Sequence, residues 1–547
     1  MYRANLPSNP RLLIYLVVIS TSHGPCHIWA EDAIDADVLL ANGTIVDGSG
    51  SPGIVGDVAV QGDRIVAVGD FEVGRVGREV SCEGLVVAPG FIDLHNHSDF
   101  LRTSEDPSTG EKSEAPAILT DSTRPAMCYL TQGCTTLVTG NCGGGAVDVG
   151  KYYAALEETR AGTNVAHLLP HGALRDRVIG QTRRAPTSEE LQEMRELARK
   201  AMSEGAWGMS TGLQYVPGSF AETDELVAIA TVVGEGDGIY ASHMRDEGDR
   251  LLEAVEEAIE IGRRGNLAVH ISHFKASKIR NWGKIRAAAE LIKSARAAGR
   301  PVTVDQYPYI ASSTTITAML LPDEEREGGG DAVVARVSDP TQLPRLRPLV
   351  QEALDARGKI MIASCPQYPN WVGKTIRDIA AAENRAPVDV ALDVIRSGTE
   401  QGVNFSMDER DVRYVMTLPW AATASDGSTK VDDGTRPHPR SYGTFPRRIG
   451  HFAIEQGVVA LEAAIRSASG LPADILGMTD RGYLRSGYLA DIAIFDPQTF
   501  RDRATFQSPF EVSTGVQYVF VNGQVAIDEG ELRITDAGLP LRKSIKH

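Results

Sequence analysis

Basic side chains are scarce in this sequence relative to acidic ones. The 547 residues include 55 Lys and Arg against 72 Asp and Glu, which gives a formal net charge of −17 at pH 7. Nucleic-acid binding depends on clustered Lys and Arg that neutralise phosphates, so this balance argues against a nucleic-acid partner. An acidic surface favours solubility and does not identify a substrate.

Cysteine is scarce as well, with six residues in the whole chain. So few thiols in a chain of this length do not form the disulfide framework of small secreted proteins. Cys26 fits a lipidation motif poorly, and a lipid anchor is not expected there. Most of the other cysteines are expected to be buried, inert thiols; Cys142 is the exception and is considered below.

Long apolar segments are absent, apart from the short run Leu12–Ile19. Arg3 and Arg11 precede this run, and Ala30 offers a small residue for cleavage, an order that is typical of a secretory signal peptide. The run is too short to cross a bilayer. We therefore expect a signal peptide at residues 1–30, export to the periplasm or the medium, and no integral membrane segment after its removal. The alternatives are a misassigned start codon or a disordered tail in place of a signal peptide, and a cytoplasmic location.

Two regions near the ends of the chain are rich in short β-like runs that are broken by glycine. Val and Ile cluster in Arg64–Gly69 near one end and in Val516–Val521 near the other, as in small antiparallel sheets. Asn522-Gly523 follows the second run directly and is a strong signal for a two-residue hairpin turn. We therefore expect residues 31–90 and 480–547 to form one small β-sandwich.

The middle of the chain, residues 91–479, alternates strand-like and helix-like segments. Thr187 and Glu190 form a capping-box pattern at the start of one amphipathic helix. About eight strand candidates, mostly joined by helices, form the pattern of a (β/α)₈ barrel. The stretch from about Ser312 to Ala363 breaks this alternation, and we interpret it as an inserted lid. The strand candidates are Phe91–His97, Thr135–Cys142, Val165–His171, a run ending at Ser210-Thr211, Ile239–His243, Leu267–His273, Val302–Tyr307 and Ala421–Asp426.

Side chains that commonly bind metals occur at the carboxyl ends of these strand candidates, which converge on one site in a (β/α)₈ barrel. His95 and His97 are two residues apart, so on a strand both imidazoles face the same side. Cys142, His243 and His273 end three further strands. Together these three would leave a fourth coordination position open for water, which is typical of catalytic rather than structural zinc sites.

Each of these residues has a simpler explanation when it is taken alone. A single histidine is more often a satisfied core or surface residue than a ligand, and a buried cysteine usually acts as a small hydrophobe. With Asp426 at the end of the last strand, however, the whole set is hard to explain by packing, and it predicts a metal site. His171 also ends a strand candidate, but an ordinary structural role is favoured for it. His270 would face away from His273 on a strand and is expected to be structural.

The segment Val87–Asp99 resembles the first-strand motif of the amidohydrolase superfamily. Within that superfamily the chain is similar to the D-aminoacylase family, whose members deacylate N-acyl-D-amino acids. The resemblance covers about Asp37 to Val525, and its Asn-Cys-Gly and His-Pro-Arg pieces are the most selective. The matching pieces occur in order at Gly140–Gly143, His171–Arg175, Ser210–Tyr215, His243–Glu247, Ile271–Lys275, Tyr307–Tyr309, Ser425–Gly427 and His438–Arg447.

This resemblance implies zinc-dependent hydrolysis of the amide bond of a small-molecule N-acyl-D-amino acid. It implies one tightly bound zinc, whose ligands are Cys142, His243 and His273. It also implies a second, weaker metal position, which His95, His97 and Asp426 would surround.

The resemblance also implies how the substrate is held. The cations Lys275 and Arg440, together with Tyr307, would bind its α-carboxylate, because a carboxylate beside the scissile amide calls for a positively charged partner. From the ligand set and the position of Asp426 we further expect that Asp426 acts as the general base and that zinc, helped by Tyr215 or His171, stabilises the oxyanion.

Two departures from the family pattern leave the substrate open. Many superfamily members carry a modified lysine on the fourth strand, where this chain has Ser210-Thr211, which disfavours a hydantoinase or a dihydroorotase. The segments Arg102–Ala115 and Ser428–Thr435 are longer than the pattern, and both could border the pocket. Two alternatives therefore stay open: another amidohydrolase reaction on a cyclic amide or a dipeptide, and a non-catalytic exported binding protein. The side-chain preference and the oligomeric state do not follow from these residues.

Overall fold

The computed structural model describes residues 33–105 and 112–544 of the chain. The predicted signal peptide at residues 1–30, with Cys26, lies outside these residues. Among the helices in the described part, none has both the length and the apolar character needed to span a bilayer.

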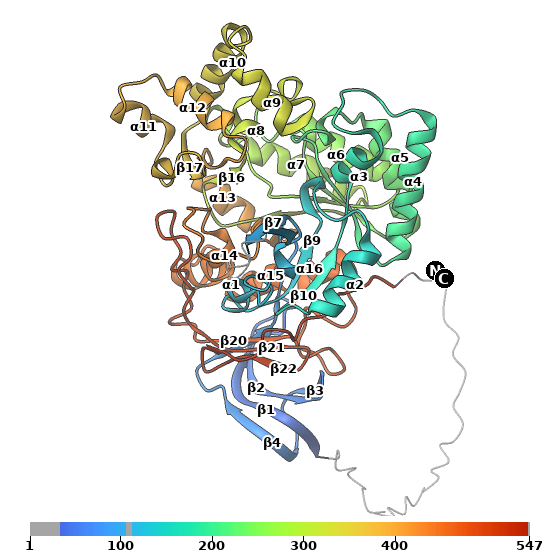
Figure 1. The fold of residues 1–547 in the computed structure, drawn as a ribbon. Coiled ribbons are helices and arrows are strands. Elements are labelled where there is room, and N and C mark those ends of the chain that lie inside the picture. The colour runs from blue at the N-terminus through green and yellow to red at the C-terminus, as the bar shows by residue number, and fades with distance from the viewer. Residues whose placement is uncertain (1–32, 106–111, 545–547) are drawn as a thin grey trace, which may run out of the picture.

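Eight parallel strand positions form a closed barrel at the centre of the molecule (Figure 1). Hydrogen bonds from His97 N to Gly427 O (2.7 Å) and from Asp426 N to His95 O (2.8 Å) join the first strand to the last and close the ring. Only Leu168 separates β10 from β11, and the two pieces together fill the third position. The strands are β6 (Phe91–Asp93), β9 (Cys134–Thr139), β10 (Asn164–His167) with β11 (Leu169–Pro170), β12 (Gly208–Gly212), β13 (Ile239–His243), β14 (Ala268–Ile271), β15 (Val302–Gln306) and β19 (Ala421–Thr423).

The predicted (β/α)₈ barrel is thus the observed fold, and amphipathic helices cover its outside. In α4, Thr187 accepts a hydrogen bond from Glu190 N and the Glu190 side chain bonds back to Thr187 N, so the predicted capping box is confirmed. The helices outside the inserted segment are α1 (Met127–Leu130), α2 (Val149–Thr159), α3 (His171–Ile179), α4 (Ser188–Ser203), α5 (Thr223–Glu235), α6 (Leu251–Gly265), α7 (Lys284–Ala297), α13 (Glu409–Met416), α14 (Arg440–Pro446), α15 (Leu461–Ala468) and α16 (Gly470–Leu476).

Strands from the two ends of the chain join in a second layer below the barrel (Figure 1). All nine belong to one hydrogen-bonded sheet, whose apolar core includes Leu40, Ile65 and Phe520. Asn522-Gly523 connects β21 to β22, so the predicted hairpin turn is confirmed. The strands are β1 (Ile34–Ile45), β2 (Ile54–Gln61), β3 (Arg64–Gly69), β4 (Val73–Ser81), β5 (Val86–Pro89), β20 (Ile492–Phe495), β21 (Val516–Val521), β22 (Gln524–Asp528) and β23 (Glu531–Leu532).

The inserted segment lies on the opposite side of the barrel and has its own apolar core (Figure 1). It extends from Ser312 to Phe405, well beyond the predicted end at Ala363, because β18 pairs with both β16 and β17 and completes a small sheet. Its elements are β16 (Ser312–Thr314), α8 (Ile316–Leu320), α9 (Gly329–Ser338), α10 (Leu343–Ala356), β17 (Lys359–Ser364), α11 (Ile376–Ala382), α12 (Pro387–Arg396) and β18 (Gln401–Phe405).

Two further segments extend from the barrel and from the terminal sheet. The long segment after the first barrel strand contains a hairpin of β7 (Leu101–Glu105) and β8 (Lys112–Pro116). The C-terminal segment leaves the sheet and returns to the barrel, where Val165 N donates to Leu539 O at 2.9 Å. The last described residues therefore pack against the barrel rather than in the terminal sheet.

Candidate metal centre and active site

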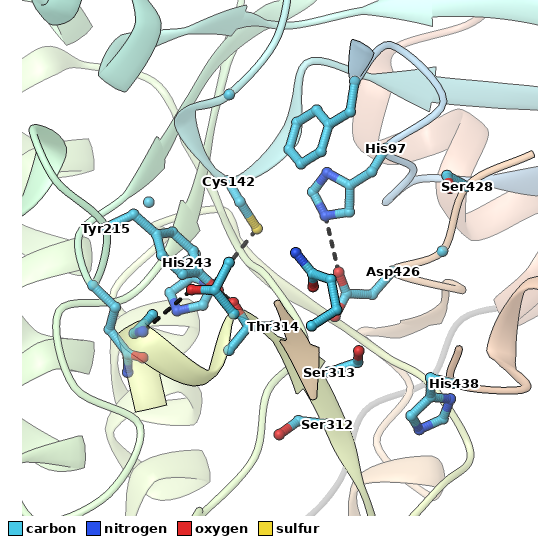
Figure 2. A pocket seen from close by; sticks show the side chains of 18 of the residues that line it. His97, Cys142, Tyr215, His243, Ser312, Ser313, Thr314, Asp426, Ser428 and His438 are labelled. Carbon is cyan, nitrogen blue, oxygen red and sulfur yellow. Dashed lines mark hydrogen bonds and ion pairs between the residues drawn. The ribbon is translucent and has the colours of Figure 1, made fainter. Parts of the chain in front are cut away.

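A cavity of about 830 Å³ opens at the carboxyl ends of the barrel strands. Its wall combines strand ends, the β7–β8 hairpin and the inserted segment, and the predicted ligands His97, Cys142 and Asp426 line it. Figure 2 shows His97 and Asp426 joined by their hydrogen bond, with Cys142 and His243 across the same view. The fold thus gathers side chains from distant parts of the chain at one site, as the ends of barrel strands do.

Three of the predicted ligands converge closely. The sulfur of Cys142 lies 3.6 Å from His243 Nδ1 and 3.7 Å from His273 Nε2, and these two nitrogens are 2.8 Å apart. Zinc bond lengths of about 2.3 Å to sulfur and about 2.05 Å to nitrogen place tetrahedral ligand atoms roughly 3.6 Å apart for sulfur and nitrogen. The observed sulfur–nitrogen distances fit that spacing, whereas the two nitrogens are closer than the roughly 3.3 Å between two tetrahedral nitrogen ligands. One thiolate and two imidazoles are ligands that suit a zinc ion, and the two rings would move slightly apart to bind it.

The backbone around Cys142 is built to aim its sulfur at the two imidazoles. Cys142 itself has a positive φ of 52° and lies between Gly140 and Gly143, whose φ angles are also positive. A Cβ on Gly143 would lie 2.8 Å from Gly212 N, so only glycine allows this close approach to the fourth strand. Ser210 ties the loop down, because its hydroxyl accepts from Gly143 N at 3.0 Å and donates to Gly140 O.

The electrostatic surroundings distinguish Cys142 from the other cysteines. Burial raises the pKa of the Cys128 thiol to about 12. Burial also opposes ionisation of Cys142, but the positive charge of His95 and the hydrogen bonds from His243 and His273 bring its pKa well below the usual value. These surroundings favour the thiolate, which is the form that binds metals. The five cysteines of the described residues are all free thiols.

The remaining predicted ligands form the other side of the cluster. His95 Nε2 lies 3.2 Å from Cys142 Sγ and 3.4 Å from Asp426 Oδ1, and His97 Nε2 lies 3.0 Å from the same carboxylate oxygen. The second oxygen of Asp426 accepts a hydrogen bond from Arg440 Nη1 at 2.6 Å. Although burial opposes it, the Arg440 charge keeps the pKa of Asp426 well below the usual range.

Two carboxylates that sequence reasoning missed orient the histidines. Glu247 Oε1 lies 2.7 Å from His273 Nδ1 and fixes which ring nitrogen faces the cluster. Asp305 bonds to His95 Nδ1 (3.2 Å) and to His270 Nε2 (2.9 Å), and it also accepts from His273 N. Carboxylates that hold the far nitrogen of a ligand imidazole are the usual supports of a metal site. The sequence did hold a signal for both residues. Glu247 lies within the matched piece His243–Glu247, and Asp305 lies only two residues before the matched residue Tyr307.

The predicted carboxylate-binding residues lie together beside this cluster. The Lys275 ammonium lies 5.9 Å and the Arg440 guanidinium 5.1 Å from the centre of the same Tyr307 ring. Tyr307 is buried, and its hydroxyl has no hydrogen-bond partner among the described residues. Lys275 also contacts Glu247 Oε1 at 2.5 Å. Tyr215 packs its ring 4.8 Å from that of His243 and accepts a hydrogen bond from Thr314.

Comparison with known proteins agrees with this geometry. A family model described as the amidohydrolase family matches residues 78–527. The D-aminoacylase of Alcaligenes xylosoxydans xylosoxydans is 35% identical over 94% of this chain and 99% of its own length. The chain belongs to the amidohydrolase family. Within it, an N-acyl-D-glutamate deacylase from the same organism is 33% identical over 89% of this chain and 93% of its own length.

A solved amidohydrolase extends the likeness to three dimensions. The N-acyl-D-glutamate deacylase of Bordetella bronchiseptica, solved with zinc and a phosphonate that mimics the tetrahedral intermediate, superposes with a TM-score of 0.78. That protein is 31% identical, and the match covers 93% of this chain and all of the other. The resemblance of the sequence to the D-aminoacylase family is thereby confirmed.

Two histidines of this amidohydrolase lie outside the cavity wall. His171 Nε2 pairs with the buried Glu225 Oε1 at 3.0 Å, which ties α3 to α5. His270 bonds to Thr303 and to Asp305, and Asp305 in turn bonds to His95. Both positions agree with the structural roles that the sequence favours for them.

Proposed function

We propose that this chain is a zinc-dependent hydrolase that cleaves N-acyl-D-amino acids into a carboxylate and a D-amino acid. One observation carries the proposal: an open set of three metal donors faces the same cavity as two cations that share one tyrosine ring. The donors are Cys142, His243 and His273, and the cations are Lys275 and Arg440. Such a cavity suits a substrate with a negatively charged group next to an amide.

Zinc would be held tightly by Cys142, His243 and His273, and a second, weaker position would lie between His95, His97 and Asp426. A zinc ion at an open three-ligand site supplies Lewis acidity, which polarises a carbonyl and lowers the pKa of water. Nearby carboxylates keep the ligands oriented. Glu247 holds His273, and Asp305 holds His95.

The chain's own residues would bind the substrate and move the proton. Arg440 and Lys275 would bind the α-carboxylate with help from the free hydroxyl of Tyr307, because two cations and a donor can satisfy both oxygens. Asp426 would take a proton from the attacking water and deliver it to the leaving amine nitrogen. Its hydrogen bonds to His97 and Arg440 hold that carboxylate in place. Tyr215, beside His243, would donate to the oxyanion.

The D-configuration rests on the named relatives, since the geometry of the cavity does not by itself select a hand. Two other functions are less favoured. Hydrolysis of a cyclic amide is disfavoured because the fourth strand has no bridging lysine, and Ser210 there anchors the Cys142 loop instead. Substrate profiling separates dipeptide hydrolysis from the proposed reaction. A non-catalytic binding protein would have no need of three metal donors and a buried carboxylate in one cavity.

The test is amine release from matched N-acetyl-D- and N-acetyl-L-amino acids by the purified, zinc-loaded protein. Release from the D-series alone is the expected result and would also reveal the side-chain preference. No release from either series by a zinc-bound protein would overturn the proposal and direct the search to cyclic amides and dipeptides.

We also propose that the protein is exported, on the strength of the apolar run Leu12–Ile19 and the small residue Ala30. N-terminal sequencing of the protein after expression from its full-length gene tests this. A mature chain that begins close to Glu31 is expected, and an intact N-terminus on a cytoplasmic protein would contradict export.

A further inference from the structure

The cavity is more cationic than the protein around it. The whole chain carries a net charge of −17, yet six cationic side chains and four carboxylates line the cavity. Four of the six cations have a carboxylate within 4 Å: Arg102, Lys275, Lys278 and Arg440. The other two cations are Arg357, on the inserted segment, and Lys430, on the loop that follows the last barrel strand.

Lys430 differs from the other cations in its surroundings. Within residues 33–105 and 112–544, its ammonium group makes no hydrogen bond and no ion pair, although the residue is half-buried at the cavity wall. The negative charge of Asp433 acts on Lys430, but Asp433 pairs with Arg102 at 3.7 Å. Burial lowers the pKa of Lys430; Asp433 opposes this shift, and the charges of Arg102 and Arg440 add to it. The half-buried ammonium group of Lys430 therefore lacks a compensating negative charge among the described residues, and a bound anion would supply one.

The backbone holds Lys430 in a defined place. Thr429 N donates to Ser98 Oγ at 2.8 Å, and Lys430 O accepts from the Tyr442 hydroxyl at 2.8 Å. Two neighbouring residues are thus tied to the first barrel strand region and to α14, the helix that also carries Arg440. A cation on a fixed backbone loses less conformational freedom when it binds a ligand, which suits it to recognition.

Both long segments that depart from the family pattern meet here. Arg102 comes from the β7–β8 hairpin, and Lys430 and Asp433 come from the Ser428–Thr435 segment. These segments flank His97, whose ring lies 4.6 Å from that of Phe100. The wall of the cavity therefore carries a second group of cations, Arg102 and Lys430, in addition to the two cations beside Tyr307.

We propose that Lys430 binds a second carboxylate of the substrate. This inference rests on the proposed function and deepens it: the preferred substrates are N-acyl-D-amino acids that carry two carboxylates. The second carboxylate belongs either to an acidic amino-acid side chain or to a dicarboxylic acyl group. Both present the same chemistry to the ammonium group, and matched substrates separate them.

The experiment compares kcat/KM for two matched pairs of substrates with the zinc-loaded enzyme. N-acetyl-D-glutamate against N-acetyl-D-glutamine tests a carboxylate in the side chain. N-succinyl-D-leucine against N-succinamoyl-D-leucine tests a carboxylate in the acyl group. Loss of a hydrogen bond to a charged group changes such ratios by about 10- to 100-fold. The expected result is a preference of that size for the charged member of one pair.

Variants then assign the preference to a residue. Lys430→Met is expected to remove the preference and Lys430→Arg to retain part of it, because Arg keeps the charge. Lys278→Gln is the matched control: it also removes a lysine from the cavity wall, but one that is paired with Asp249 at 2.7 Å, and the preference should survive. If Lys430→Met does not fold, as judged by zinc content and thermal midpoint, Lys430→Gln replaces it.

Three results would overturn the inference. They are no preference in either pair, a preference that survives in Lys430→Met, and a preference that is lost in Arg357→Gln instead. In each of these three cases the enzyme would still hydrolyse N-acetyl-D-leucine. Failure of the proposed function is different, because then no N-acyl-D-amino acid is hydrolysed at all.

Discussion

The two sides of the metal cluster are built from different donors and have different neighbours. On one side, Cys142, His243 and His273 face one another, and a carboxylate outside the cluster supports His273. On the other side, Asp426 shares its oxygens between His97 and the Arg440 guanidinium. A metal on that side must compete with a cation for the carboxylate. The first side is therefore suited to hold an ion, and the second to bind substrate and move a proton.

The largest expected effect comes from removing the sulfur. Cys142→Ser should lose the tightly bound zinc, and kcat/KM should fall by about 10,000-fold, because the ion supplies most of the catalytic power. Metal content by mass spectrometry after gel filtration, together with amine release, checks both. A variant that keeps its zinc and its activity would mean that the ion sits elsewhere.

A substitution of Asp426, on the other side of the cluster, should separate the effect on catalysis from the effect on zinc binding. Asp426→Asn is expected to lower kcat by about 1,000-fold through loss of the general base, while the tightly bound zinc stays in place. The same two measurements apply. Substantial remaining activity would contradict the role of Asp426 as the general base. Loss of zinc would show that the two sides act as one metal site.

Arg440→Gln tests the substrate-binding role of the second side. We expect kcat/KM to fall by about 100-fold, mainly through a higher KM, because the α-carboxylate loses a charged and bidentate partner. Steady-state kinetics with an N-acyl-D-amino acid and with its α-amide measure this. The α-amide should be a poor substrate for both forms of the enzyme; an equal loss with both substrates would point to a role in holding Asp426 alone.

Glu247→Gln tests whether the carboxylate behind His273 helps the Cys142 side of the cluster to hold zinc. The variant should weaken zinc binding by about 10- to 100-fold, since the carboxylate orients His273. Competition with a chelator of known affinity gives the dissociation constant. The Glu257→Gln variant is a suitable control, because Glu257 pairs with Arg245 outside the cluster and should leave zinc affinity unchanged.

His97→Asn should have the smallest effect. His97 Nε2 bonds to Asp426 Oδ1, and His97 is not among the three expected ligands of the tight zinc, so we expect about a 10-fold fall in kcat/KM and full retention of that zinc. Zinc content and kinetics test this. Loss of the tight zinc in this variant would remove the distinction between the two sides.

Local patterns in the sequence were informative about strands and ligands because each pattern lies within a few residues. The run of Val and Leu before Cys142 and the His-x-His spacing of His95 and His97 both depend on neighbours along the chain. Glu247 and Asp305 carry no such local signature. Their roles come from contacts with histidines on other strands, and no periodicity reports those contacts.

The sequence by itself determined which segments become barrel strands, because strand formation and side-chain alternation are short-range properties. Of the predicted metal ligands, His243 ends its strand, whereas Cys142, His273 and Asp426 lie in the segments that follow β9, β14 and β19. The sequence also determined the donor types and, through the family motifs, their expected roles. Only the tertiary structure decided that the inserted segment extends to Phe405, that Arg440 pairs with Asp426, and that Lys430 has no hydrogen-bond or ion-pair partner among the described residues at the cavity wall. These outcomes depend on which distant segments meet when the barrel closes, and that pairing is a property of the folded chain.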